Sequence, residues 1–306
     1  MLKIAAALLL FALPPAAAEL PAPLDDSQVF SAMEGEMNRA LRGLKQDAFG
    51  PPYFMAYRIV DARRYNMTAS YGSTLSESSS DGRNLFVELR FGDRLLDNTD
   101  LSFHGMRGGG GRTPEVLRQN LWNLTDAAYK SAVMGFLEKK AKRVTEYTPD
   151  VLADFTEEKT VRDLQADPGP IFDQKRAKAL AERLSAVFRK YPDIFDAKVS
   201  VSLNWGRRYL LTSEGTKIAD EDEHVPHSLR MMAMTRAEDG MRLDANKGWP
   251  LRRLEDLPAE GELIAEAGRL AELLVAARKA PVQAPIAAPA ILDPEVTGVL
   301  FHEALG

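Results

Sequence analysis

The chain has 306 residues, 45% of them hydrophobic, and a formal net charge of −5 at pH 7. This length is enough to bury one large core or two ordinary ones. The acidic balance offers no positive field to attract phosphates, so no nucleic-acid partner is expected. The sequence contains no cysteine, which excludes disulfides and lipid attachment through cysteine, so stability must come from the core.

Residues 1–18 have the order of a secretory signal peptide. One cation precedes an apolar run over residues 4–13, and small residues follow at Ala16 and Ala18. Cleavage after Ala18 would leave a mature chain beginning at Glu19, exported to the periplasm or the extracellular space and free of the membrane. The alternative is an uncleaved anchor, but a run of about ten residues is shorter than the ~20 that a spanning helix needs.

The first element predicted after the signal is an amphipathic helix whose start is marked by acidic residues, as the helix dipole favours. Its apolar residues recur at spacings of three and four: Val29, Met33, Met37, Leu41 and Leu44. Gly50-Pro51-Pro52 ends this helix. Residues 53–94 are rich in aromatic and branched side chains with partial alternation, which predicts two to four antiparallel strands and a turn at Asp81-Gly82.

Four consecutive glycines lie between His104 and Arg112. A phosphate loop would need glycines at fixed offsets followed by Lys and then Ser or Thr, so the run is interpreted as a mobile surface loop, and His104 receives no role. A helix is predicted from Pro114 to about Arg143. Its cationic last turn, residues 138–143, suits a helix C-terminus; contact with an acidic partner is the alternative.

Two more helices flank a second group of strands. The first runs from about Asp173 to Lys190, and the second from Leu257 to Lys279. Between them, residues 197–240 alternate in polarity and predict a meander of three or four strands, with turns at Trp205-Gly206 and at residues 213–215. The whole pattern predicts an α+β fold, with antiparallel sheet or sheets covered by helices on one face.

The last predicted helix begins at Asp293, which can accept from free backbone donors, and Pro294 is tolerated at its first position. His302 and Glu303 then lie about two turns into the helix. An imidazole can bind zinc while the next carboxylate reaches the metal-bound water as general base. The common H-E-x-x-H motif has its second histidine at i+4, where this chain has Gly306. That spacing is excluded, and a structural His-Glu pair is the alternative.

The run GVLFHEALG at residues 298–306, with the strand-to-helix entry before it, closely resembles the TldD/PmbA family of metallopeptidases, once described as modulators of DNA gyrase. Catalytic members carry H-E-x-x-x-H, and this chain matches as far as the residue before the second His. Residues 209–216 and 228–236 resemble two strands of the family more weakly, and Ala288-Pro289 stands where the family has Gly-Pro. The resemblance covers roughly the last hundred residues.

The resemblance implies a Zn²⁺ site with His302 as first metal ligand and Glu303 as catalytic base. The second His and a distant Cys are expected in a C-terminal domain beyond this chain, so the chain as written should bind zinc poorly and cleave nothing. The expected organisation is a signal peptide over residues 1–18, an N-terminal α+β region over residues 19–292, and the start of the metal-binding helix over residues 293–306.

The expected function is therefore the N-terminal portion of an exported zinc-dependent peptidase that acts on short or unfolded peptides. The family implies a ring-like homodimer, or a heterodimer with a related subunit. One alternative is a non-catalytic partner subunit or binding domain of such a complex. Another is an extracytoplasmic structural domain without chemistry.

Residues 221–227 gather acids and two imidazoles, a composition that could hold a metal. An extended chain would point His224 and His227 to opposite faces, and Pro226 forbids a helix, which favours an acidic loop or a place in the lining of the peptide cleft. Four aromatic residues occur at strand spacing: Tyr65, Tyr71, Phe86 and Phe91. This spacing favours positions in the core, and a substrate groove is the alternative.

Overall fold

The computed structural model describes residues 24–45, 49–99, 105–145, 152–167, 169, 172–222, 226–281 and 284–306. The predicted signal peptide, His104 and His224 lie outside these ranges. The elements are, in chain order, α1 (Asp26–Gly43), β1 (Phe54–Ser70), β2 (Ser73–Arg90), β3 (Met106–Gly109), α2 (Pro114–Thr145), β4 (Arg162–Leu164), α3 (Gln174–Ala186), η1 (Val187–Lys190), β5 (Asp196–Thr212), β6 (Lys217–Glu221), β7 (His227–Arg236), β8 (Arg242–Leu251), η2 (Leu254–Asp256), α4 (Glu260–Ala277) and α5 (Pro294–Leu305).

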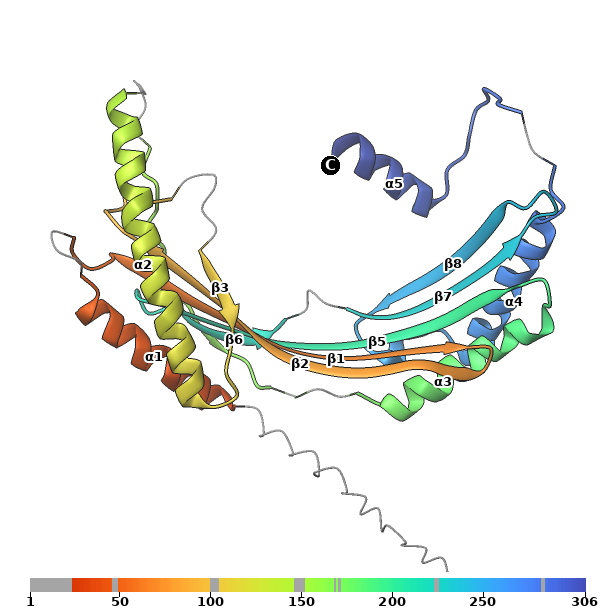
Figure 1. The fold of residues 1–306 in the computed structure, drawn as a ribbon, viewed down its shortest axis with the longest axis horizontal. Coiled ribbons are helices and arrows are strands. Elements are labelled where there is room, and N and C mark those ends of the chain that lie inside the picture. Colours follow the sequence, from red (N-terminus) through yellow and green to blue (C-terminus); the bar gives the residue numbers. More distant parts are fainter. Residues whose placement is uncertain are drawn as a thin grey trace, which may run out of the picture.

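The strands form one eight-stranded sheet with the order β3-β2-β1-β5-β6-β4, and β7 pairs with both β5 and β8. Every pair is antiparallel except β4 with β6. The sheet is curved like a trough, with α1 and α2 at one end, α3 and α4 at the other, and α5 above the hollow (Figure 1). The α+β prediction is confirmed, since the helices of the core pack on one face of a largely antiparallel sheet.

Side chains alternate along the long strands, and the odd-numbered positions face the helices. At one end Tyr57 and Leu85 pack with α1 and α2 in a first core cluster. At the other end Met67 and Val201 pack with α3 and α4 in a second one. The even-numbered positions therefore make up the concave face, which carries none of these four helices.

Helix α1 begins where the sequence predicts. The Asp25 carboxylate accepts from the backbone of Gln28 at 2.9 Å, and the Gln28 side chain accepts from the backbone of Asp25 at 3.1 Å, which completes a capping box. Val29 and Met33 are fully buried. The apolar stripe read from the sequence thus docks this helix on the sheet.

The turn predicted at Asp81-Gly82 is wrong. Both residues lie inside β2, opposite Arg63 and Ala62 of β1. The chain reverses instead at Tyr71 and Gly72, whose φ angles of 46° and 80° suit a two-residue hairpin loop. Asp-Gly at a strand centre misled the prediction because the same pair is common in tight turns.

The turn predicted at Trp205-Gly206 is also wrong, since β5 continues through it and Gly206 pairs with Ala62. The turn at residues 213–215 is confirmed by Gly215, which has a φ of 107°. The predicted meander is only partly correct. Strand β5 pairs with β6 through its C-terminal half and with β7 through its N-terminal half, so that β6 and β7 diverge from one shared neighbour.

The glycine run is not the surface loop predicted from the sequence, because Gly108 and Gly109 end the edge strand β3, paired with β2. A Cβ on Gly110 would lie 2.3 Å from the Arg83 side chain, and one on Gly111 would lie 2.4 Å from Val116. The run therefore lets β3, Arg83 and α2 approach one another closely, which only glycine permits.

The residues at the centre of the sheet are small: Ala62 of β1 pairs with Gly82 on one side and with Gly206 on the other. This central part of the sheet is called the waist below. On the helix-bearing face of this waist lies a charged row rather than a core. Asp61 accepts two hydrogen bonds of 2.5 Å from Arg83. Beside it, Arg207 is almost fully buried, donates to Asp26 at 2.5 Å, and has no partner for Nη1 among the described residues.

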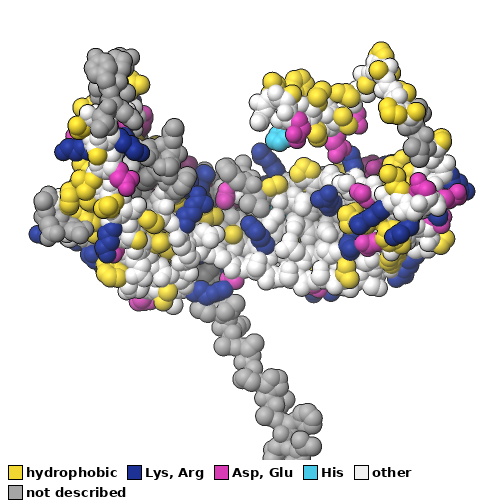
Figure 2. Space-filling view, turned by 45° about the horizontal axis from the view of Figure 1, so that its top comes forward, with side chains coloured by type: hydrophobic (Ala, Val, Ile, Leu, Met, Phe, Trp, Pro, Cys, Tyr) yellow, Lys and Arg dark blue, Asp and Glu magenta, His cyan; other side chains and the backbone are white. Residues whose placement is uncertain are grey.

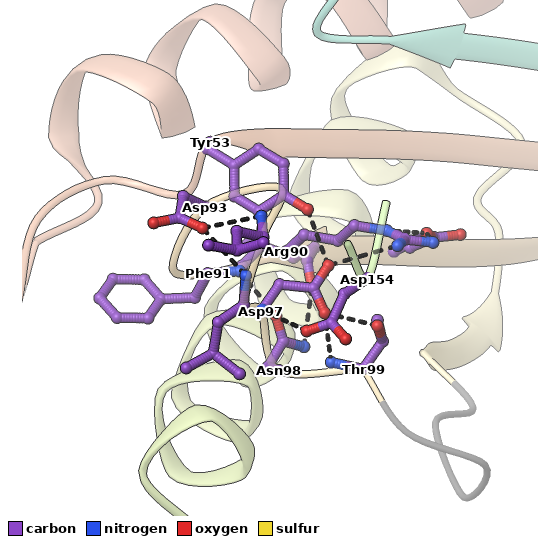
Figure 3. A network of polar contacts seen from close by, with 12 residues as sticks. Tyr53, Arg90, Phe91, Asp93, Asp97, Asn98, Thr99 and Asp154 are labelled. Carbon is purple, nitrogen blue, oxygen red and sulfur yellow. Dashed lines mark hydrogen bonds and ion pairs between the residues drawn. The ribbon is translucent and has the colours of Figure 1, made fainter. Parts of the chain in front are cut away.

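A second polar network anchors the loop after β2 (Figure 3). The carboxylate of Asp97 is fully buried and accepts from Tyr53 at 2.7 Å and from the backbone of Thr99 at 2.7 Å. The backbone of Asp97 donates to Asp154 at 2.8 Å, and Asp154 accepts from Lys139 at 2.6 Å. The cationic end of α2 therefore contributes to the fold, because Lys139 forms an ion pair with Asp154 of a neighbouring segment.

Candidate functional site

Helix α5 carries the His-Glu pair on a regular, well-capped helix. The Asp293 carboxylate accepts from the backbone of Val296 at 2.8 Å, and Pro294 occupies the first turn. The backbone of Gly306 donates to the carbonyl of His302 at 3.0 Å. That i to i+4 bond places Gly306 one turn above His302, so no imidazole occupies the position that the common zincin spacing requires.

Both side chains of the pair are exposed, and α5 as a whole buries no residue. Its apolar side is uncovered as well, with Val299 and Phe301 each more than half exposed. One ion pair joins the helix to the sheet, from Glu295 to Lys247 at 4.0 Å. Across the described ranges, no group of three His, Asp or Glu side chains is arranged to hold a metal.

A cavity of about 600 Å³ lies where β6 and β7 diverge from β5. Its lining includes Trp205 from β5, Glu221 from the end of β6, and Asp222 and His227 on either side of the connection. The acidic stretch noted in the sequence therefore borders a hollow, and the described part of it forms no three-residue metal group. This cavity was not located from the sequence, because it depends on two strands sharing one neighbour.

His227 closes the unpaired edge of β5 at this cavity. Its Nδ1 accepts a 2.9 Å hydrogen bond from the backbone of Asn204, and its ring lies edge-on to Phe172 at 6.1 Å. Burial lowers the pKa of His227, and the nearby carboxylates of Glu221 and Glu255 oppose that shift only in part. The neutral imidazole thus accepts a hydrogen bond from the backbone of β5, which favours a structural role for His227.

The four aromatic residues singled out in the sequence divide between the core and the concave face. Tyr65 and Phe91 are buried, as a core position requires. Tyr71 lies in the hairpin turn and donates to the carbonyl of Ile194 at 2.8 Å. Phe86 lies on the concave face, where the guanidinium groups of two arginines stand over its ring. The substrate-groove alternative therefore survives only for Phe86.

The molecule thus presents an α+β sheet covered by helices on one face, with a His-Glu helix above the other. No family model matches the chain, and no curated protein does. A solved structure described as a modulator of a DNA gyrase, from Thermotoga maritima, matches with a TM-score of 0.49 at 14% identity, over 78% of this chain and 48% of its own.

Two further solved structures are similar to the same extent. TldE from Thermococcus kodakarensis has a TM-score of 0.47 at 12% identity, over 79% of this chain and 47% of its own. A protein described as a modulator of DNA gyrase from Bacteroides thetaiotaomicron has a TM-score of 0.46 at 15% identity, over 81% and 49%. These are proteins of the TldD/PmbA family, and the chain spans about half of their length.

Proposed function

We propose that this protein is a zinc-dependent peptidase of the TldD/PmbA type that hydrolyses short or unfolded peptides. The observation that carries the proposal is the motif on α5, in which His302 and Glu303 are adjacent, exposed and held by a capped helix. Its sequence context, GVLFHEALG, resembles that of the family. Because the chain spans about half of the length of the solved structures it matches, the activity is proposed for the complete protein.

The described residues supply only part of a zinc site. A catalytic zinc takes three protein ligands and keeps one position open, whereas His302 has no second and third ligand among the described residues. The described residues therefore do not fit a complete site. We propose His302 as one ligand, and two others from residues outside the described part or from a second subunit.

Glu303 has the properties of a proton acceptor for an attacking water. It follows His302 directly, so the two side chains leave the helix on adjoining faces about 100° apart. It is exposed, which leaves it accessible to a water and a peptide approaching from the hollow of the trough. A positioned carboxylate in this role contributes about 10²–10⁴-fold to a rate.

The test replaces Glu303 by Gln in the natural protein and follows hydrolysis of an unfolded substrate such as denatured casein. We expect E303Q to lose at least about 100-fold in kcat while its zinc content stays that of the wild type, because the base is lost and the ligand kept. H302A should lose zinc. E262Q, which changes an exposed carboxylate on α4, is the matched control and should stay within about two-fold. Full activity in E303Q would remove Glu303 as base.

A different outcome would favour the alternative function. If the purified natural protein contains no metal and hydrolyses nothing, the described fold would fit a non-catalytic partner subunit. The incomplete ligand set among the described residues favours that alternative, whereas the His-Glu pair favours the peptidase.

Export is proposed on the sequence of residues 1–18, which has the order of a signal peptide. No helix within the described ranges is long and apolar enough to cross a membrane. Assembly as a homodimer, or with a related subunit, is proposed from the family resemblance alone.

A further inference from the structure

The concave face of the sheet has a composition unlike that of the rest of the molecule. Its even-numbered positions near the waist are small and polar, and the hydroxyls of Thr68 and Ser200 bond at 3.0 Å across β1 and β5. Figure 2 shows this face largely free of apolar side chains, with Lys and Arg groups over it. It is therefore a hydrogen-bonding surface, not an exposed core.

Four arginines on this face lack an acidic partner among the residues that the structure describes. Arg58 and Arg64 on β1, Arg107 on β3 and Arg230 on β7 are exposed. Arg58 and Arg107 both stand over the ring of Phe86, at 4.6 and 5.7 Å from its centroid, and Arg230 donates to Asn246 at 3.2 Å. Arg58 and Arg107 thus stand close to one another over one ring, and neighbouring like charges repel, which costs stability unless an anion is bound near them.

Most carboxylates of the same face are already neutralised. Three ion pairs account for them: Asp220 with Arg208 at 2.5 Å, Asp196 with Lys198 at 2.8 Å, and Glu88 with Arg90 at 2.7 Å. Asp244, on the outer strand β8, is the exception. The face consequently keeps an excess of positive charge in a chain whose net charge is −5.

We propose that the concave face is the docking surface for an acidic, extended segment of the polypeptide substrate. The six residue steps from Arg58 to Arg64 span about 20 Å at about 3.3 Å per residue, the length of about six residues of an extended peptide. Asn84 and Ser80 lie opposite this stretch on β2 and are exposed, so their side chains can bond to the backbone of such a peptide. The inference rests on the proposed function for the identity of the ligand as a peptide.

The position of α5 relates this surface to the chemistry. The helix stands above the hollow of the trough (Figures 1 and 2), and its first turn contacts the sheet through Glu295 and Lys247. A peptide lying along the face would pass beneath the helix that carries His302 and Glu303. The concave face would thus bind an acidic segment of the substrate, while the peptide bonds next to that segment reach His302 and Glu303.

A nucleic acid fits this surface less well than a peptide. Single strands bind through aromatic rings on which successive bases stack, and the one ring identified above on this face, Phe86, already stacks with two guanidinium groups.

The test measures fluorescence anisotropy of labelled, unstructured Gly-Ser peptides of about 16 residues that carry four Glu, four Gln or four Lys. We expect the Glu peptide to bind the natural protein at least ten-fold more tightly than the other two, and to weaken between about 50 and 300 mM salt. The triple variant R58Q/R64Q/R230Q should lose at least ten-fold for the Glu peptide. All three side chains are exposed, so the fold should persist.

The matched control removes three exposed cations from the helical layers. R118Q/K175Q/K190Q changes the net charge equally and should stay within about two-fold of the wild type. Equal losses in both triple variants, or no preference for the Glu peptide, would overturn the proposal. So would a single-stranded oligonucleotide that binds more tightly than the Glu peptide and loses binding in the concave-face variant.

The same measurement in an E303Q background separates this inference from the proposed function. Docking should be unchanged there, because Glu303 lies on α5 and not on the sheet. A wild-type protein that hydrolyses nothing but binds the acidic peptide would refute the peptidase alone. Glu303-dependent hydrolysis without a charge preference would refute the docking surface alone.

Discussion

Asp97 shows how a single side chain fixes a loop in this molecule. Burial by itself raises the pKa of its carboxyl, but hydrogen bonds from Thr99 and Tyr53 and the charge of Arg90 outweigh burial and hold that pKa below its ordinary value. The ionised form is therefore the one that the fold stabilises. Its contribution is present above about pH 3.9 and is lost as the pH falls through the lowered pKa.

Replacing Asp97 by Asn should be strongly destabilising. The amide keeps the shape but brings an NH₂ group to a site lined with donors, and it leaves Arg90, 3.3 Å away, with Glu88 as its remaining charge partner. We expect a loss of roughly 2–4 kcal/mol of unfolding free energy at pH 7, measured by urea denaturation. D126N, which breaks the exposed pair of Asp126 with Lys130, should cost less than about 1 kcal/mol. Equal costs would show that the network contributes nothing beyond a surface pair.

His227 should make the stability of the protein depend on pH. Its pKa is lowered in the folded state, whereas the unfolded chain has the ordinary value near 6.5. The unfolded state therefore binds the proton first as the pH falls, so stability is complete above about pH 6.5 and declines below it. Protonation also removes the acceptor for the backbone N–H of Asn204.

The variant H227N keeps an acceptor near the position of Nδ1 and removes the titration. Urea midpoints of the wild type should fall between pH 7 and pH 5, and those of H227N should fall less over the same range. A slope identical to that of the wild type would assign the pH dependence to other groups.

At the scale of elements, the long hairpin of β1 and β2 depends on one glycine. Gly72 has a φ of 80°, and a Cβ there would lie 2.9 Å from the Arg189 side chain and 3.0 Å from that of Ala186. Gly82 lies in regular strand, and a Cβ added to it would meet no described atom within 4 Å. The two positions therefore differ in what they tolerate.

We expect G72A to lose roughly 1–2 kcal/mol, since an L-residue is strained at this backbone conformation. G82A should change stability by less than about 1 kcal/mol, in either direction. Thermal denaturation of the two variants against the wild type is the measurement. A cost at Gly82 equal to that at Gly72 would contradict the strand register described above.

At the scale of the whole molecule, one continuous sheet carries two cores. The clusters under α1 and α2 and under α3 and α4 are separated at the waist by the charged row of Asp61, Arg83 and Arg207. Strands β1, β2 and β5 cross that row unbroken, and the small residues opposite it, Ala62 and Gly206, leave room for the sheet to bend. The bend creates the concave face on which the proposed substrate surface lies.

The sequence by itself determined what local chemistry decides. The helix beginning after Asp25 followed from the acidic residues at its start and its apolar spacing, and the placement of His302 on a capped helix followed from Asp293-Pro294. Each depends on residues within a few positions of one another. The α+β class followed from the change of period along the chain.

Only the tertiary structure decided where strands end and which side chains meet. Asp81-Gly82 and Trp205-Gly206 have the composition of turns, yet long-range pairing with β1 holds both in strands, because a ladder on one or both sides outweighs local turn preference. The charged waist, the cavity beside His227 and the arginines of the concave face join residues from distant parts of the chain. No local pattern encodes such proximity, since it follows from strand order and register.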